Sequence, residues 1–474
     1  MKSHYTFYYL LLFVLILPIN AAYAQSNYKL TYDQLREYEG TYAFVNNTTL
    51  QIAASPRDTM LYALVGDSKY KLRAYKKDIF LNGGNQEVHF IRNNTGITGY
   101  QVKDKTPDKF YPLITKKVTF SNDMWFARGN NKLPFHWVYS PPKDMHDGIP
   151  TGSLINSGLD TGLIHTMINR IVNQSYSDIN SILIIKEGKL VLEEYFYGFT
   201  ADSLHQLRSA TKSFASALVG IAVDKHLIKS TDEKLLSFYP EYSIANPDDR
   251  KKAITIQDML TQRSGFACDD DDDNSAGNEN KIYPTHDWIK TMLDLPMINE
   301  PGKVGSYCSG NVILLDGIVE KTSHQKLHDF AAENLFSKLG VKRFNWDFVP
   351  DQSHQESFGQ ISLRPRDMAK FGMLYLNNGK WKGIQVISAD WVKQSITKHS
   401  NIRGIDYGYL WWCEDLTANG KVYRGAAAKG NGGQRIFIWP DQKMIAVITA
   451  GNYNTQSPAN RMLIDCVLGG LKTP

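Results

Sequence analysis

Residues 207–224 read LRSATKSFASALVGIAVD, and this segment restricts the fold more than any other part of the chain. The run from Phe214 to Val223 is apolar almost throughout, so as a helix it must be buried in a protein core. Ser209 would then lie at the helix N-terminus, where unpaired backbone N–H groups and the helix dipole favour negative charge. Lys212, three residues later, would lie on the same face, within reach of the serine hydroxyl.

Two interpretations of this pair remain open on the segment alone. In the first, Ser209 is a nucleophile, and Lys212, its pKa lowered by enclosure, helps to remove the serine proton. In the second, Ser209 caps the helix and Lys212 is a surface charge in its first turn. The spacing Ser-x-x-Lys occurs six times in the chain, but only the copy at Ser209 is followed by a long apolar helix.

Two later segments favour the first interpretation. In GSYCSGNVILLDGIVEK, Tyr307 opens a short loop before another buried helix, and a tyrosine beside an ammonium group can act as a general base. In AAAKGNGGQRIFIWP, the glycines allow close backbone approach and offer an N–H group to an oxyanion. Each segment alone is more often a core aromatic residue or a hairpin turn. The three segments together, in this order, indicate a nucleophilic serine site.

The N-terminus carries the pattern of a cleaved secretory signal. Lys2 precedes an apolar run from Phe7 to Leu17, and small residues follow at Ala22 and Ala24. These features predict a signal peptide over residues 1–24, cleavage near Ala24, and export to the periplasm or the medium. An uncleaved membrane anchor is the alternative, but the run is short for a bilayer, and no transmembrane segment is predicted in the mature chain.

The mature chain divides into two regions with different patterns. Residues 27–120 alternate polar and apolar positions between Asn- and Gly-rich turns, which predicts a small all-β domain, a sandwich or a partial barrel. Residues 121–158, rich in Pro, Gly and Asn, are typical of a linker. Residues 159–474 show a helix, a hairpin at Glu187–Gly188, a mostly helical stretch to about residue 400, and then strands and a helix. This order predicts an α+β fold with one antiparallel sheet built from both ends and an inserted helical subdomain.

Composition and missing motifs argue against several classes of protein function. The net charge of +5 is scattered without a Lys/Arg block, so no nucleic-acid partner is expected. Without a Gly-x-Ser-x-Gly or His-Glu-x-x-His motif, neither an α/β-hydrolase nor a zinc site is expected, and no cofactor or metal is predicted. The acidic run Asp269–Asp273 lacks EF-hand spacing and is more typical of a solvated loop than of a cation site. Cys268 and Cys308 either pair or are small buried hydrophobic residues, and the sequence leaves both open.

Together these motifs resemble the serine β-lactamase and DD-peptidase superfamily, on the side of the class C enzymes and their esterase relatives. The order of hairpin, Ser209-Ala-Thr-Lys212, tyrosine loop and glycine-rich strand matches that group. The stretches LRSATKSF, ITIQDMLTQRSGF, SLRPRDMAKFGMLYLNNGKW and YGYLWW are also similar to it. The resemblance implies a β-lactamase-like catalytic domain over residues 159–474. The region before it is similar to the small lipocalin-like domains that accompany some relatives.

The resemblance also implies roles for individual residues. Ser209 would be the acylated nucleophile, Lys212 would assist its deprotonation, and Tyr307 would be the general base that also serves the leaving group and water. The backbone N–H of Ser209 would form an oxyanion hole with an N–H from a second segment, which comprises Gly430, Asn431 and Gly432.

Two departures from the family pattern bear on the substrate. The Tyr-x-Asn motif becomes Tyr307-Cys308-Ser309, with Ser309 in place of asparagine, and the Lys-Thr-Gly motif has no clean match. In β-lactamases these elements grip the substrate amide and carboxylate. The Tyr-Cys-Ser form is more similar to 6-aminohexanoate-dimer hydrolases and carboxylesterases, which favours a small-molecule or peptide-like ester or amide substrate. The alternatives are a true DD-peptidase or β-lactamase, and a non-catalytic binding or sensor module on the same fold.

Overall fold

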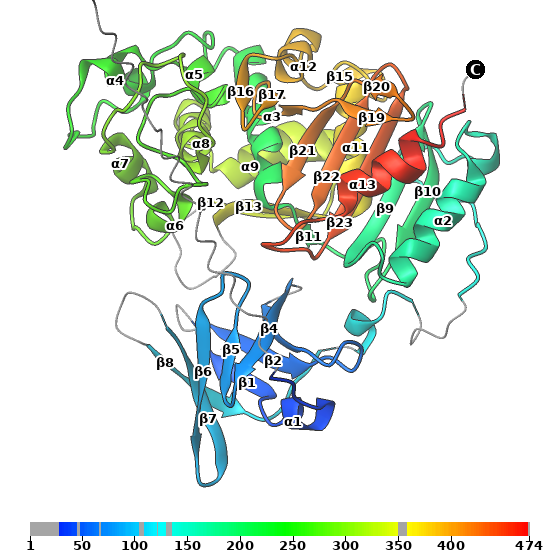
Figure 1. Ribbon diagram of the computed structural model, residues 1–474. Helices are drawn as coiled ribbons and strands as arrows, with labels where there is room; N and C mark the ends of the chain where they lie inside the picture. Colours follow the sequence, from blue (N-terminus) through cyan, green and yellow to red (C-terminus); the bar gives the residue numbers. More distant parts are fainter. Residues whose placement is uncertain are drawn as a thin grey trace, which may run out of the picture.

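The computed structural model describes residues 28–44, 48–65, 68–103, 109–120, 122–128, 135–348 and 358–472. The predicted signal peptide lies outside these described residues. Figure 1 shows a barrel formed by the early chain, in blue, beneath a larger body of sheet and helices. We call residues 40–115 the barrel and residues 135–472 the larger region.

The barrel is a closed antiparallel sheet of eight strands in sequence order. Its first strand pairs with both the second and the eighth, which closes the sheet. Alternate residues therefore face the interior, where Tyr42, Ile52, Phe80 and Phe90 form an apolar core. The elements are α1 (Tyr32–Arg36), β1 (Gly40–Ala43), β2 (Thr49–Ala54), β3 (Leu61–Val65), β4 (Ser68–Lys76), β5 (Ile79–Leu81), β6 (Glu87–Asn93), β7 (Gly96–Val102) and β8 (Phe110–Thr115).

The larger region is built on an eight-stranded antiparallel sheet in the order β10-β9-β23-β22-β21-β18-β17-β16. The strands are β9 (Ile179–Lys186), β10 (Lys189–Tyr195), β16 (Ser400–Ile402), β17 (Ile405–Tyr407), β18 (Trp412–Cys413), β21 (Ala426–Gly430), β22 (Gln434–Trp439) and β23 (Met444–Ala450). The early strand β9 pairs with the late strand β23, so the prediction of one sheet built from both ends is confirmed. The predicted hairpin is also present, with Glu187 and Gly188 at positive φ in its turn.

Three long helices of the larger region pack on this sheet or on one another. α3 (Thr211–Asp224) is buried from Thr211 to Ala222, as its apolar run predicts, and it packs against α8 (Ser309–Ser323). α11 (Pro365–Leu376) packs on β9, β22 and β23, and its Phe371 stacks on Phe214 of α3 with ring centroids 3.7 Å apart. In Figure 1, α2 (Thr161–Val172) and α13 (Ala459–Met462) lie across the other face of the sheet.

The stretch between α3 and residue 400 contains the predicted helical subdomain and also strands that the sequence did not predict. Its helices are α4 (Asp249–Ala253), α5 (Ile256–Leu260), α6 (Glu279–Ile282), α7 (Trp288–Leu293), α9 (Leu327–Ala331), α10 (Ser337–Leu339) and α12 (Ala389–Ser395). A three-stranded sheet joins β11 (His205–Gln206), β13 (Phe358–Leu363) and β12 (Asn345–Phe348), in that order. β13 packs beside the turn that leads into α3, so this small sheet supports the start of that helix.

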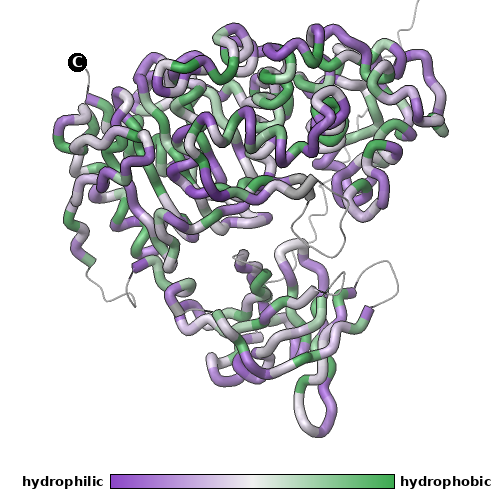
Figure 2. Tube along the Cα trace, turned by 180° about the vertical axis from the view of Figure 1, so that it is seen from behind, coloured by the Kyte–Doolittle hydropathy of each residue, from purple (hydrophilic) through white to green (hydrophobic). Residues whose placement is uncertain are grey.

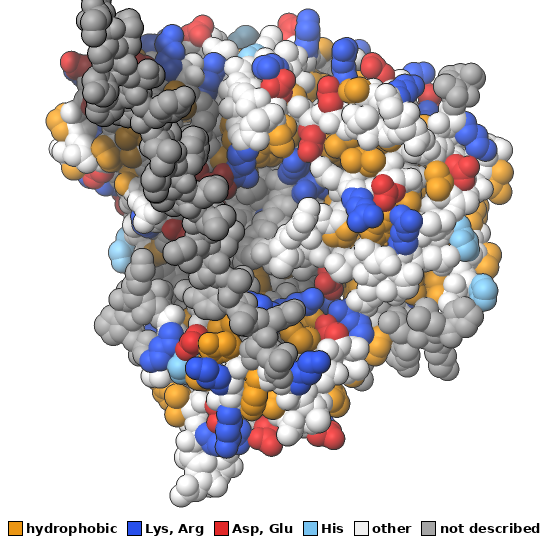
Figure 3. Space-filling model, in the orientation of Figure 1, with side chains coloured by type: hydrophobic (Ala, Val, Ile, Leu, Met, Phe, Trp, Pro, Cys, Tyr) orange, Lys and Arg blue, Asp and Glu red, His pale blue; other side chains and the backbone are white. Residues whose placement is uncertain are grey.

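Hydropathy follows this architecture. Figure 2 shows hydrophobic residues along the inner strands and helices of the larger region, and hydrophilic residues in its outer loops. Figure 3 shows Lys and Arg interspersed with Asp and Glu over the visible face, in line with the scattered charge of the sequence. Among the described residues, no helix combines the length and the apolar character needed to cross a bilayer.

Candidate active site

Ser209 and Lys212 lie where the helix begins. Ser209 is in a short 3₁₀ turn, Arg208–Ala210, and α3 follows directly at Thr211. The Lys212 ammonium donates a hydrogen bond to Ser209 Oγ at 3.2 Å. Ser209 is partly exposed, whereas the Lys212 side chain is buried, so the lysine is not the surface charge of the second interpretation.

The tyrosine loop meets this pair from α8. Tyr307 is two residues before the helix, which starts at Ser309. Lys212 Nζ lies 4.8 Å from the centre of the Tyr307 ring and donates a second hydrogen bond to Ser309 Oγ at 2.9 Å. The structure thus brings together four of the residues singled out in the sequence, from two segments almost one hundred positions apart.

The ring of Tyr307 is enclosed by aromatic and cationic side chains. It stacks on Trp412 with centroids 5.5 Å apart, and the Arg403 guanidinium lies 4.7 Å from its centre. Arg403 occupies the tight turn between β16 and β17, at φ 55°, and pairs with Asp271. Sequence reasoning missed Arg403, although the dipeptide Arg-Gly between two short strands marks a turn of this type.

Two carboxylates complete the surroundings of Ser309, and sequence reasoning missed both. Ser309 donates to Asp270 Oδ2 from its backbone N–H and from its hydroxyl, each at 2.7 Å, and its hydroxyl also lies 2.9 Å from Glu279 Oε2. A hydroxyl has one proton to donate, so both contacts are satisfied only when one of the two carboxyl groups is protonated. Burial raises the pKa of Asp270 from 3.8 to about 6. The positive charge of Lys212 opposes this shift, and the negative charge of Glu279 adds to it.

The prediction of a solvated acidic loop is therefore wrong for Asp270. The following residues, Asp271 to Asp273, are exposed as expected, but Asp270 turns inward and also accepts from the Glu279 N–H at 3.1 Å. The signal that could have identified it is its position two residues after Cys268, which faces the tyrosine loop. Among the residues that the structure describes, no group of three or more potential ligands could hold a metal ion.

The prediction of a lowered pKa for Lys212 is also wrong. Burial alone would lower the pKa of this ammonium, but Tyr307, Asp270 and Glu279 together raise it above the usual value for lysine. The prediction considered only the effect of burial on the pKa of Lys212. It could not include carboxylates from a loop that is distant in the sequence. With a raised pKa, Lys212 is a permanent positive charge beside Ser209 at neutral pH.

A disulfide bond ties the acidic loop to the tyrosine loop. Cys268 and Cys308 are bonded, across a sequence separation of 40, which decides the question that the sequence left open. Backbone contacts reinforce the link, because the Asp270 N–H donates to the Tyr307 carbonyl at 2.8 Å. The same bond thus fixes the loop that carries Asp270 beside the loop that carries Tyr307.

The glycine segment lies against the serine turn from the opposite side. A side chain on Gly430, at the end of β21, would put its Cβ 2.0 Å from the Leu207 carbonyl oxygen, so only glycine fits there. Gly432 has φ 87°, and Asn431 exchanges hydrogen bonds with Asn454. The close approach of Gly430 is thus to the protein's own backbone at Leu207, and the Asn431 side chain is exposed and engaged with a loop.

Comparison with known proteins gives a consistent result. Residues 180–468 match the protein family described as Beta-lactamase. The chain is 24% identical over 291 residues to a 6-aminohexanoate-dimer hydrolase of Paenarthrobacter ureafaciens, covering 56% of this chain and 71% of that protein.

Solved structures share the fold. A family VIII carboxylesterase has a TM-score of 0.51 at 16% identity, covering 65% of this chain and 96% of that one. A penicillin-binding protein homologue from Caulobacter crescentus has a TM-score of 0.52 at 14% identity, covering 68% and 99%. The relatives named as a dimer hydrolase and a carboxylesterase are hydrolases, and the family match spans more than half of this chain. The chain therefore belongs to the beta-lactamase family.

Proposed function

We propose that this protein is an exported serine hydrolase that cleaves an ester or amide of a small-molecule or peptide-like substrate through an acyl-enzyme on Ser209. The observation that carries the proposal is the buried Lys212 ammonium. It contacts Ser209 Oγ at 3.2 Å, Ser309 Oγ at 2.9 Å and the face of Tyr307 at 4.8 Å. A buried charge is costly unless it is paired, and here its partners include a partly exposed hydroxyl.

We propose Tyr307 as the group that carries the proton transfers, because Lys212 is held as a positive charge. Ser209 Oγ attacks the carbonyl carbon while the deprotonated phenolic oxygen of Tyr307 accepts the serine proton, with Lys212 as a fixed charge that stabilises the oxygen atoms involved. The C–O or C–N bond to the leaving group then breaks, and Tyr307 returns the proton to the departing atom. Water repeats the sequence on the acyl-enzyme and releases the acid. Backbone N–H groups of Ser209 and of the Asn431–Gly432 segment would bind the oxyanion.

The surroundings of Ser309 favour a role in positioning Lys212. Its hydroxyl already contacts Lys212, Asp270 and Glu279, so it has no free capacity to grip a substrate amide as the asparagine of the family does. This supports the linear ester or amide branch over penicillin hydrolysis. The relative named 6-aminohexanoate-dimer hydrolase points the same way.

We also propose a division of the chain into a signal peptide and two domains joined by a linker. A signal peptide over residues 1–24 would be removed near Ala24. A lipocalin-like domain (27–120) would be joined through a linker (121–158) to the hydrolase domain (159–474). The closed barrel of the early strands supports the lipocalin-like domain. N-terminal sequencing of protein recovered from the periplasm and the medium tests the signal peptide, and an intact Met1 would contradict it.

Covalent labelling tests the proposed nucleophile. Wild type and Ser209→Ala are exposed to a fluorophosphonate, a penicillin and a short activated ester, and their intact masses are compared. We expect one adduct on the wild type and none on Ser209→Ala. The matched control is Ser323→Ala, which removes another serine three residues before a lysine and should label like the wild type. If folded wild type takes up none of the probes, the chain is the binding or sensor module instead.

A further inference from the structure

The barrel contains a cavity of about 640 Å³ at the end that faces the larger region, a volume within the range of small-molecule sites. Side chains from several strands line it, and most are apolar. Phe44, Ala63, Val65 and Val102 pack toward the barrel core but are only partly buried. An eight-stranded barrel is wide enough either to be filled by its own side chains or to hold one small ligand. The described side chains of the barrel leave its interior unfilled at this end.

Residues of the larger region form the rest of the wall. They include Asp178, the loop after β23 with Tyr453, and Arg208, the residue directly before Ser209. Arg208 also lines a second cavity, of about 30 Å³, beside Ser209 and Lys212. A single side chain therefore borders both the barrel cavity and the serine site.

Arg208 is held in an unusual conformation at this junction. Its φ is 51°, in the left-handed region that residues with a side chain seldom adopt. The guanidinium donates to the Tyr70 hydroxyl of the barrel at 3.2 Å and lies 4.9 Å from the ring centre of Tyr453. Arg208 Nε is buried and makes no hydrogen bond to any described residue. The Nε–H group of Arg208 can therefore donate a hydrogen bond to a polar group of a ligand at the end of the cavity near Ser209.

The open end of the barrel is fixed in position by a buried ion pair. Lys69 of β4 contacts Asp178 at 3.1 Å and donates to the Met124 carbonyl at 2.8 Å, with only 8% of its side chain exposed. Its ammonium also lies 4.5 Å from the centre of the Tyr197 ring. The barrel cavity is therefore held facing Arg208 by contacts that do not depend on a ligand.

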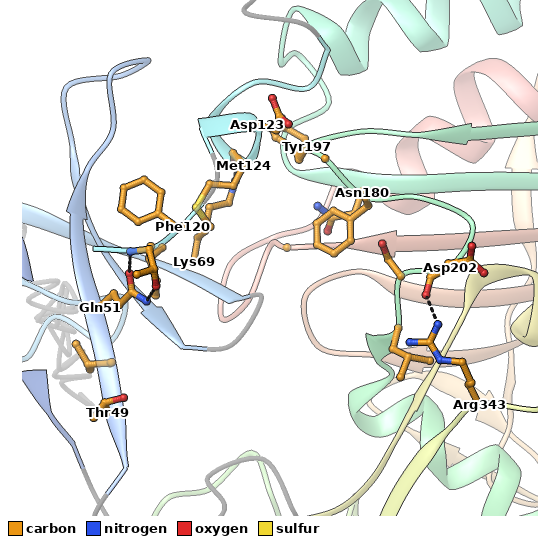
Figure 4. Close-up of a pocket in the computed structure, with 18 residues that line it drawn as sticks. Thr49, Gln51, Lys69, Phe120, Asp123, Met124, Asn180, Tyr197, Asp202 and Arg343 are labelled. Atoms are coloured by element: carbon orange, nitrogen blue, oxygen red, sulfur yellow. Dashed lines mark hydrogen bonds between the residues drawn. The ribbon is translucent and has the colours of Figure 1, made fainter. Parts of the chain in front are cut away.

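A second large cavity lies between the barrel and the larger region but has a different character. It measures about 680 Å³, and Figure 4 shows Thr49, Gln51 and Phe120 on the barrel side of it, across from Asn180, Tyr197 and Asp202. Polar and apolar surface contribute about equally to its wall, whereas apolar surface predominates in the barrel cavity, and Arg208 does not line it. It therefore offers an apolar chain less apolar contact, and neither chain neighbour of Ser209 lines it.

We propose that the barrel cavity is the binding site for an extended apolar acyl chain of the substrate, with the carbonyl end of that chain at Arg208 and Ser209. The proposal rests on the proposed serine hydrolase function and adds the substrate class: esters or amides of medium- to long-chain fatty acids. The apolar wall accepts the chain, and Arg208 Nε donates to its polar end.

A series of activated esters tests the chain preference. We expect kcat/KM of the full-length wild type to rise from p-nitrophenyl acetate through the butyrate and hexanoate to the octanoate, by about two- to fourfold per buried methylene. Ala63→Phe, which fills the cavity, should flatten the series. The matched control, Ile91→Phe, adds the same ring at a barrel position with 37% exposure and should keep the slope. A flat series for the wild type would overturn the proposal.

Binding without turnover separates this proposal from the hydrolase proposal. Full-length Ser209→Ala is titrated with a fluorescent C16 fatty acid, and we expect saturable binding of one molecule. Ala63→Phe should weaken that binding at least tenfold in the same background. If Ala63→Phe does not fold, Val102→Phe is the second filling variant.

The outcomes are distinguishable. Fatty-acid binding by Ser209→Ala, combined with no fluorophosphonate adduct on the wild type, would support the cavity site and refute the hydrolase. An adduct on the wild type, with no saturable fatty-acid binding and a flat ester series, would support the hydrolase and refute the cavity site.

Discussion

At the scale of single residues, the site is organised around the charge of Lys212. Its ammonium lies inside the protein, and the groups facing it include two hydroxyls, an aromatic ring and the nearby Asp270 and Glu279. Such an arrangement offsets the cost of burying the charge and keeps it positive. Ser209, the proposed nucleophile, is the partly exposed end of this buried network.

Removing the charge of Lys212 should abolish turnover. We expect Lys212→Met to lower kcat/KM for an activated ester by about 10³-fold or more, since it removes the charge next to the nucleophile. Ester hydrolysis and circular dichroism measure activity and folding together. Lys370→Met is the matched control: that lysine is equally buried, paired with Asp367 at 3.0 Å, and lies on another helix. If both variants lose activity equally while folded, the role of Lys212 is structural only.

Deleting one oxygen atom tests Tyr307. Tyr307→Phe keeps the ring that stacks on Trp412, so the fold should persist. We expect kcat to fall by about 10²- to 10⁴-fold, the range for loss of a general acid–base group. Steady-state hydrolysis is the measurement, and Tyr407→Phe, a buried tyrosine packed edge-on against the same tryptophan, is the control. Full activity of Tyr307→Phe would exclude it as the base.

The pKa of Asp270 gives a prediction for stability against pH. Because the pKa is raised in the folded state, from 3.8 to about 6, the carboxyl stabilises the fold below pH 4, and that stability is lost as the pH rises through about 6. The full loss amounts to about 3 kcal/mol, at about 1.4 kcal/mol per tenfold change in a dissociation constant. Asp270→Asn does not titrate, so its stability relative to wild type should increase from pH 4 to pH 7.

Thermal or urea unfolding of both proteins at several pH values measures this difference. Asp272→Asn is the control, because that residue is exposed in the same loop and its substitution should leave the pH profile unchanged. A constant difference between Asp270→Asn and wild type across this range would mean that Asp270 titrates as an ordinary carboxyl group.

At the scale of elements, two loops carry the site and one covalent bond joins them. The loop after α5 supplies Asp270, and the loop before α8 supplies Tyr307, with Cys268 and Cys308 bonded between them. Loops have little packing of their own, so a link of this kind limits how far the two can separate. Helix α3 is held in place by packing, because it is buried along most of its length.

Removing the disulfide should loosen this part of the site. Cys268→Ser with Cys308→Ser frees a closed loop whose ends are 40 residues apart, which corresponds to about 4 kcal/mol of chain entropy at most. We expect a lower Tm and a lower kcat/KM in the double variant. Cys466→Ser, which changes a buried free cysteine, is the control for serine substitution itself. An unchanged Tm would show that packing alone holds the two loops together.

The sequence predicted those parts of the site that depend on local order. Ser209 and Lys212 follow from helix periodicity and an apolar run, and Tyr307 follows from its place before a second such run. Asp270, Glu279 and Arg403 were not predictable in the same way, because their roles arise from contacts between segments that no periodicity connects. The error on the pKa of Lys212 has the same origin, since it depends on those carboxylates.

At the scale of the whole molecule, local patterns predicted some of the strands, whereas the closure of the barrel and the remaining strands were not predictable. The alternation of polar and apolar residues identified the early strands. The hairpin at Glu187–Gly188 and the sheet built from both ends were also predicted. The closing pair between β1 and β8 and the unpredicted sheet of β11, β12 and β13 depend on distant pairings. The Lys69–Asp178 pair that fixes the barrel also joins residues from separate regions, which the sequence alone does not connect.

The pairing of β9 with β23 has a consequence for how the protein is made. During synthesis, β9 and β10 are complete long before residues 444–450 leave the ribosome, so the inner edge of β9 stays uncovered for most of translation. That strand is largely apolar, and every residue from Ile179 to Ile185 is buried in the finished fold. The early barrel can close on its own strands in that interval. The nascent sheet, and any chain truncated before β23, would instead expose an edge prone to aggregation and dependent on chaperones.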